Sequence, residues 1–204
     1  MKKVIVMLAC VLAIGAASAQ ENNSKKFELG CNIGMTTFSN YSALSLFQDA
    51  TDSYSNWSGA IHFGYRINNS LLGVQAQHAH FNTSALALDE TAMWWNFSLM
   101  LRHYINVGGN WETFYGLKFG LSVTENSFKY LGDDYSRTRL GMNGEFETGI
   151  HYRFDNGNHI GLRVAFNLYG SHFDKDLNLP AGLLANDKRT LDGYSLMLQY
   201  GLSF

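Results

Sequence analysis

The feature that most constrains this chain is an alternation of apolar and polar residues, repeated in eight segments over residues 27–204. Side chains in a β-strand point alternately to opposite faces, so a period of two predicts strands with one apolar and one polar face. In the fifth segment, Leu117 and Phe119 share one face and Lys118 lies on the other. Each segment spans about 10 to 14 residues, whereas globular strands average about five or six and a strand crossing a bilayer needs about 9 to 11. Segment length therefore favours strands that cross a membrane.

The connections between the segments alternate in length. Short connections rich in Asn, Asp and Gly follow the second, fourth and sixth segments, as expected of tight turns. Long connections are expected over residues 39–56, 82–91, 124–139 and 173–190. Short turns at one end and long loops at the other predict an all-β, up-and-down antiparallel barrel of eight strands, with both chain ends beside the short turns.

Residue size indicates which face of the barrel points inward. The apolar face carries Trp, Tyr, Phe and Leu along every segment, more volume than the interior of an eight-stranded barrel can hold. The polar face is rich in Gly, Ser and Asn and lacks the many Lys and Glu residues of a water-facing surface. We therefore expect lipid outside and polar residues inside. A soluble, lipocalin-like ligand-binding barrel with the faces reversed is the alternative that alternation alone leaves open.

The ionisable residues of the polar face are nearly balanced in sign. Buried charges persist when they are paired, so we expect an interior network in which Glu145 and Glu147 reach Lys118 and Arg163. Isolated, solvated charges are the alternative. Four acidic and five basic residues make up the predicted network: Glu28, Glu112, Glu145, Glu147, Arg66, Arg102, Lys118, Arg153 and Arg163.

Aromatic residues near the ends of the segments fit girdles at the two membrane interfaces. Packing into the barrel wall is the alternative for several of them. The predicted girdle residues are Trp57, Trp94, Trp95, Trp111, Tyr152, Phe154, Tyr194 and Phe204.

The first 19 residues have the pattern of an export signal. Two lysines precede an apolar stretch that ends in the small-residue cleavage pattern Ala17-Ser18-Ala19. We expect residues 1–19 to be removed and residues 20–204 to form one domain. A lipoprotein-type cleavage pattern ending at Cys10 is the alternative, but the apolar stretch before it is shorter than the usual minimum of about 7 residues.

Composition excludes several other classes of protein. Removing the two lysines of the signal from 15 basic residues leaves 13 against 17 acidic ones, a mature net charge of −4 that gives no footprint for nucleic acid. No run of 18 apolar residues follows Ala19, which argues against a helical membrane span. The mature chain keeps one cysteine, Cys31, and so cannot form an internal disulfide.

Taken together, the sequence resembles the small eight-stranded outer-membrane barrels of the OmpA-like and OmpX-like type, and in particular the outer membrane β-barrel proteins of Bacteroidetes-type bacteria. Its C-terminal residues Tyr200, Leu202 and Phe204 are similar to the end signal that the barrel-assembly machinery reads in this family. The resemblance implies a bacterial outer-membrane protein with periplasmic termini and extracellular long loops. Its implied partners are this assembly machinery, outer-membrane lipid and lipopolysaccharide, and the barrel is expected to be a monomer.

A structural or surface-interaction role without an open pore is the predicted function, because an eight-stranded interior has no room for an aqueous channel. The resembling group also includes lipid A modifying enzymes, and such an enzyme is the alternative. The deacylase-type His-x-Ser pattern is absent from the sequence, and Ser171 and His172 are adjacent residues that point to opposite faces of a strand, whatever the position of Asp174. His78 and His80 share a face but have no evident third metal ligand. We therefore predict no catalytic, cofactor-binding or metal-binding residues.

Overall fold

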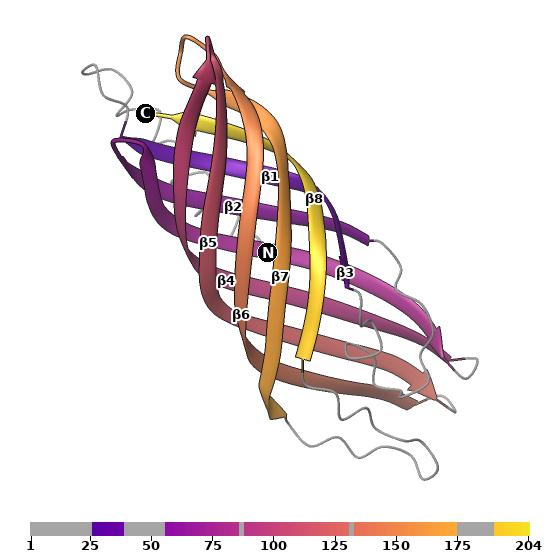
Figure 1. The fold of residues 1–204 in the computed structure, drawn as a ribbon. Helices are drawn as coiled ribbons and strands as arrows, with labels where there is room; N and C mark the ends of the chain where they lie inside the picture. Colours follow the sequence, from indigo (N-terminus) through magenta and orange to yellow (C-terminus); the bar gives the residue numbers. More distant parts are fainter. Residues whose placement is uncertain (1–25, 39–55, 86–87, 131–132, 175–189) are drawn as a thin grey trace.

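The protein is an eight-stranded antiparallel barrel, in which each strand pairs with its chain neighbours and the last pairs with the first (Figure 1). The computed structural model describes residues 26–38, 56–85, 88–130, 133–174 and 190–204. The predicted export signal and Cys10 lie outside these residues. The strands are β1 (Phe27–Phe38), β2 (Asn56–Ile67), β3 (Ser70–Ala85), β4 (Leu88–Gly108), β5 (Trp111–Tyr130), β6 (Asp133–Arg153), β7 (His159–Asp174) and β8 (Thr190–Ser203). The predicted up-and-down barrel is confirmed.

The barrel closes where its first and last strands meet. The backbone N–H of Phe27 donates to the carbonyl of Phe204 at 2.9 Å, and the Phe204 N–H donates back to the Phe27 carbonyl at 3.0 Å. Their rings stack with centroids 6.0 Å apart. Closure removes the free edges that an open sheet would leave unpaired.

The three short connections form tight turns at one end of the barrel, which we call the turn end. Asn68 adopts a positive φ of 53° in the turn between β2 and β3. Gly108 and Gly109 have φ values of 126° and 57° between β4 and β5, and a side chain at either position would be strained. Gly157 plays the same part between β6 and β7, with a φ of 85°.

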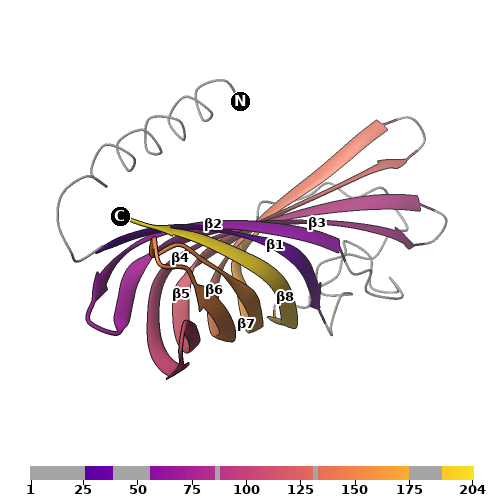
Figure 2. The same cartoon turned by 90° about the horizontal axis from the view of Figure 1, so that it is seen from above.

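At the opposite end, which we call the hairpin end, two predicted loops are wrong. β3 continues to Ala85 and β4 begins at Leu88, so most of the predicted loop 82–91 is strand. β5 and β6 likewise stay paired up to Tyr130 and Asp133, within the predicted loop 124–139. The outward residues of the β5–β6 stretch are polar, so backbone pairing continues where the apolar alternation that revealed the strands has stopped. Inside this stretch, Phe128 is buried and stacks on Tyr135. Figure 2 shows the two hairpins projecting beyond the rest of the ring.

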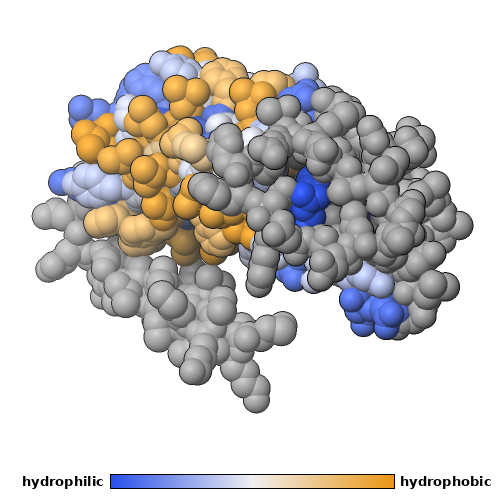
Figure 3. All heavy atoms as spheres, turned by 90° about the horizontal axis from the view of Figure 1, so that it is seen from below, coloured by the Kyte–Doolittle hydropathy of each residue, from blue (hydrophilic) through white to orange (hydrophobic). Residues whose placement is uncertain are grey.

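Large apolar side chains cover the outside of the barrel, as predicted. Leu99 is 67% exposed, Leu117 61% and Phe119 57%, and Figure 3 shows such residues gathered on the barrel wall. On β5 this apolar belt ends at Val123, after which exposed Glu125 and Lys129 take the outward positions. The reversed, lipocalin-like arrangement of the faces is therefore wrong.

No helix among the described ranges is long and apolar enough to cross a membrane.

One predicted girdle residue lies inside the barrel. Trp94 is fully buried, whereas Trp57, Trp95 and Trp111 are 74%, 41% and 48% exposed on the outer wall. Trp94 and Trp95 are adjacent in a strand, so only one of them can face outward. We call the group that Trp94 joins near the hairpin end the aromatic cluster; it comprises Phe38, Ala79, Phe81, Ala92, Trp94 and Tyr169.

Candidate functional site

The interior of the barrel holds the candidate site, and its centre is the carboxylate of Glu147 on β6. The Arg102 guanidinium on β4 donates to it twice, from Nε at 2.8 Å and from Nη2 at 3.2 Å. Lys118 Nζ lies 2.7 Å and Arg163 Nε 2.6 Å from the same carboxylate. All four side chains are fully buried. One carboxylate thus links β4, β5, β6 and β7 across the lumen.

Glu145 supplies the second carboxylate of this group. Lys118 Nζ lies 2.6 Å from Glu145 Oε1, and Arg163 Nη2 also donates to Glu145. Lys118 completes its hydrogen bonds by donating to Gln75 Oε1 at 2.8 Å. The five residues Arg102, Lys118, Glu145, Glu147 and Arg163 are called the ion cluster below.

The pairing register of β5 and β6, together with the small size of Gly116, positions the charged groups of the ion cluster. Lys118 lies directly opposite Glu145 in the β5–β6 ladder, and Gly116 lies opposite Glu147. A Cβ at Gly116 would come within 2.9 Å of Glu147 Oε1 and of the Leu101 carbonyl. Glycine at this position therefore gives the Glu147 side chain room to cross the lumen toward Arg102.

The ion cluster has three cations and two carboxylates, and Glu28 on β1 supplies a further negative charge beside Arg102. Its Oε1 accepts from Tyr104 Oη at 3.0 Å, contacts His62 Nε2 at 3.1 Å and lies 3.8 Å from Arg102 Nη1. The sequence predicted an inward Glu28 but missed His62 and Tyr104 as partners. Both occupy inward positions of alternating strands, which was the signal available, but sequence spacing says nothing about which residues meet across a lumen.

A second ionic group lies at the turn end around Glu112. Arg153 Nη2 and His151 Nε2 each lie 2.8 Å from Glu112 Oε2, and Arg66 Nη2 lies 3.3 Å from Oε1. The Glu112 side chain is 14% exposed, so this group sits where the lumen opens. The guanidinium carbon of Arg66 also lies 4.4 Å from the centre of the Tyr104 ring. Because Tyr104 donates to Glu28, this contact connects the two ionic groups.

The structure places all nine predicted network residues on the inward face of the barrel. Glu145 and Glu147 each contact both Lys118 and Arg163, as predicted. Glu28 and Glu112 lie nearer the turn end, each with partners of its own. Buried ion pairs add little net stability relative to apolar packing, but removing one partner leaves an uncompensated charge. The arrangement therefore connects the strands of the barrel wall across the lumen and fills its centre. Its carboxylates are already paired with side-chain cations.

Between the ion cluster and the aromatic cluster lies a neutral polar layer to which all eight strands contribute. Gln77 Nε2 on β3 donates to Ser58 Oγ at 3.2 Å, and Ser195 Oγ lies 2.9 Å from both Thr36 Oγ1 and Asn167 Nδ2. We call this layer the amide belt; it comprises Asn32, Thr36, Ser58, Gln77, Asn96, Ser98, Ser122, Asn143, Asn167 and Ser195.

The other residues weighed for chemistry lie apart from this interior. His78 stacks on Trp95 with ring centroids 4.1 Å apart, and His80 contacts Asn82. Within the part of the chain that the structure describes, no three His, Cys, Asp or Glu residues gather as a metal site. The side chains of residues 171–174, with the weighed serine and histidine, lie outside the described ones.

One serine–histidine contact was missed because its members are 33 residues apart. Ser70 Oγ lies 3.1 Å from His103 Nδ1 across the β3–β4 ladder, on the outer wall near the turn end. A serine nucleophile needs a base that a third group orients. Among the described contacts His103 meets the Tyr115 ring and no carboxylate, so the pair lacks the group that would orient it.

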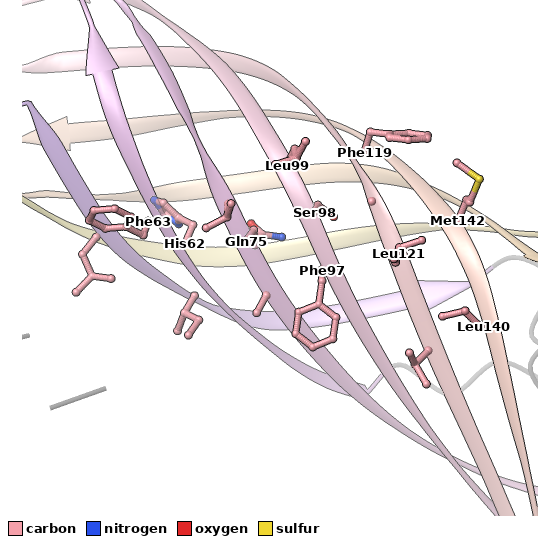
Figure 4. A pocket seen from close by; sticks show the side chains of 16 residues that line it. His62, Phe63, Gln75, Phe97, Ser98, Leu99, Phe119, Leu121, Leu140 and Met142 are labelled. Atoms are coloured by element: carbon pink, nitrogen blue, oxygen red, sulfur yellow. The ribbon is translucent and has the colours of Figure 1, made fainter. Parts of the chain in front are cut away.

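The outer wall also carries an open apolar hollow of about 890 Å³ across β1 to β6. Figure 4 shows Phe97, Leu99 and Phe119 among its lining side chains. Most of the lining belongs to the apolar belt of the outer wall, and its polar members His62, Gln75 and Ser98 are buried residues of the inward face.

The C-terminal residues lie on the outer face of β8 and just beyond it. Tyr200 is 41% exposed, and Leu202 and Phe204 are half-buried. Phe204 contacts Phe27 as described above, at the seam of the barrel.

Comparisons with known proteins agree with this architecture. The family model for the outer membrane protein β-barrel domain matches residues 6–204. The structure is similar to Neisserial surface protein A, with a TM-score of 0.59, 16% identity, and coverage of 90% of this chain and 100% of that one. It is also similar to Ail, the attachment invasion locus protein of Yersinia pestis, with a TM-score of 0.53, 11% identity, and coverage of 88% and 100%. No curated protein sequence matches the chain.

Proposed function

Because this chain belongs to the outer membrane protein β-barrel domain family, we propose that it is a closed, non-conducting barrel that presents its hairpins for contact at the bacterial surface. The observation that carries the proposal is the continuation of β3 to β6 as a paired sheet past the apolar belt. The name of Ail records an attachment role for that protein, which is the kind of function proposed here.

The interior supports the non-conducting part of the proposal. Arg102, Lys118 and Arg163 reach Glu147 from three other strands, and all are fully buried. Eight strands enclose a space that side chains just fill. No catalytic residue is proposed.

The hairpins support the contact part of the proposal. Outward side chains beyond the belt are polar on β5 and β6, as at Glu125, Ser136 and Thr138. We propose that the turn end and both termini face the periplasm, that the hairpin end faces the medium, and that the polar outer faces of the hairpins lie among lipopolysaccharide sugars while the belt contacts outer-membrane lipid. We also propose that the barrel acts as a monomer.

Surface labelling tests this orientation. With Cys31 replaced by serine, Ser136→Cys on the β5–β6 hairpin is expected to react with a membrane-impermeant maleimide on intact cells. Asn156→Cys, in the turn between β6 and β7, is expected to react only after the outer membrane is permeabilised. Both positions are exposed, so accessibility within the barrel does not separate them. Labelling of Asn156→Cys alone on intact cells would reverse the proposed orientation.

We further propose that the C-terminal residues Tyr200, Leu202 and Phe204 are read by the barrel-assembly machinery. Phe204→Ala keeps the backbone pair with Phe27 but removes the ring, so less folded barrel is expected in the outer membrane of cells. The refolding yield of the purified chain is expected to stay close to that of the parent. Tyr194→Ala, another outward aromatic of β8 that is 54% exposed, is the matched control. Equal losses in cells for both variants would contradict a specific end signal.

A further inference from the structure

Three buried histidines meet in the lumen beside Glu28. Nε2 of His62 on β2 lies 3.1 Å from Glu28 Oε1, and Nε2 of His159 on β7 lies 3.8 Å from the same atom. The ring of His151 on β6 stacks on that of His159 with centroids 4.3 Å apart. All three histidine side chains are fully buried. We call His62, His151 and His159 the histidine layer.

Two glycines allow the rings of this layer to lie over the seam of the barrel. Gly30 on β1 pairs with His62 on one side and with Gly201 of β8 on the other. Gly201 pairs in turn with His159. A Cβ at Gly30 would collide with the His62 ring, and a Cβ at Gly201 would collide with the ring of His159. The two imidazoles therefore pack against the backbone of β1 and β8, where the barrel closes.

The charges around the histidine layer are already paired, with a positive excess. Glu28 lies 3.8 Å from Arg102, and Glu112 lies 2.8 Å from both His151 and Arg153. The nine residues of the predicted network hold five positive and four negative charges, a net charge of +1, which three further protons would raise to +4. The charged and titratable groups that face the layer are Glu28 of β1, Arg66 of β2, Arg102 and Tyr104 of β4, Glu112 and Lys118 of β5, and Arg153 of β6, while β3 and β8 contribute the neutral Gln75 and Gln199.

The hydrogen bonds of the layer suit neutral rings. The Nδ1 atoms of His62, His151 and His159 are buried and have no partner in the part of the chain that the structure describes. A neutral ring can leave one nitrogen without a proton, whereas a protonated ring donates from both and would bury an unpaired, charged N–H. Protonation of both stacked rings would also bring two like charges face to face.

We propose that the histidine layer is an acid-sensitive closure of the turn end. At neutral pH the three neutral rings pack over the seam between β1 and β8 and keep this end of the lumen shut. An exposed histidine gains a proton below a pH of about 6.5. Opened forms of the turn end therefore bind more protons than the closed barrel, and acid favours them. The ion cluster contains no histidine, so the opening is expected at the turn end and not in the centre of the barrel.

Thiol labelling of the refolded barrel in detergent micelles tests where the opening occurs. With Cys31 replaced by serine, Ser203→Cys places a thiol at the turn end of β8, and Ser195→Cys places one on the same inward face toward the hairpin end. Both serines are buried. Each ring that is exposed on opening contributes about tenfold between pH 7.5 and 5.5. Lowering the pH over this range is therefore expected to raise the ratio of the Ser203→Cys to the Ser195→Cys labelling rate by about a hundredfold or more.

This ratio cancels the effect of pH on thiol reactivity, and pH 5.5 lies above the ordinary pKa of a glutamate side chain, about 4.3. A ratio that does not change with pH overturns the proposal, because any effect of acid would then reach both ends of the barrel alike.

Histidine variants test which groups cause the opening. His159→Gln removes one titrating ring and is expected to reduce the acid-induced rise of the labelling ratio by about tenfold. His80→Gln removes an exposed histidine of the outer surface and is expected to leave the rise unchanged. Heat-modifiable gel mobility confirms folding, and His151→Gln replaces the His159 variant if that variant does not fold. An equal rise in the parent and in the folded variant of the histidine layer overturns the assignment to these rings.

Discussion

Replacing Glu147 by alanine is expected to lower the free energy of unfolding of the barrel by about 3–5 kcal/mol, the usual cost of removing one partner from a buried ionic group. Arg102, Lys118 and Arg163 all contact this carboxylate and are fully buried. Without it, three cations share Glu145 and the more distant Glu28. Urea titration of the refolded barrel in lipid vesicles, followed by gel mobility of unboiled samples, measures the change.

Two further variants identify the cause of that loss. Glu147→Gln keeps the size of the side chain but removes its charge, so it is expected to lose most of the same free energy. Glu125→Ala removes a carboxylate from the exposed outer face of β5 and is expected to unfold at nearly the parent's urea concentration. A Glu147→Ala midpoint equal to that of Glu125→Ala would show that the ion cluster does not stabilise the barrel.

The strands could be predicted from the sequence because one face of each must be apolar to contact lipid. That requirement holds from Trp111 to Val123 on β5 and disappears beyond Glu125. The remaining part of β5, up to Tyr130, stays paired with β4 and β6. Its outward residues Glu125, Ser127 and Lys129 are polar, so the apolar alternation no longer marks it as a strand. The sequence therefore predicts the membrane-crossing part of the barrel well and underestimates the length of its hairpins.

The interior was predictable as a set of residues but less so as a set of contacts. Lys118 and Glu145 are direct neighbours in one ladder, so strand order and register are enough to bring them together. Glu28 and Tyr104 lie on β1 and β4, strands that are not neighbours, and they meet through the lumen. Such a contact depends on the closure and tilt of the barrel, which alternation within a strand does not encode. The burial of Trp94 is a different case, because alternation within β4 already allows only one of two adjacent tryptophans to face outward, and Trp95 shares the outward face with Phe97.

A charged residue in the middle of the apolar belt gives the second large effect. Leu117→Arg is expected to lower the free energy of unfolding in lipid vesicles by about 2–4 kcal/mol, the range for an arginine on the lipid face near the bilayer midplane. Leu117 is 61% exposed and stands midway along the outward apolar positions of β5, between Trp111 and Val123. Its replacement therefore places a guanidinium where only acyl chains can surround it.

The matched control lies on the same face of the same strand. Ser127 points outward beyond Val123, so Ser127→Arg introduces the same side chain where water can solvate it, and a cost of about 0–1 kcal/mol is expected. The difference in the free energy of unfolding between the two variants measures the effect of depth in the bilayer. Both variants place the same charged side chain on the same face of the same strand, between the same two neighbouring strands. Equal losses of unfolding free energy in the two variants would mean that the apolar belt does not end near Val123. They would also mean that the hairpins do not extend beyond the membrane, as their polar outer faces lead us to expect.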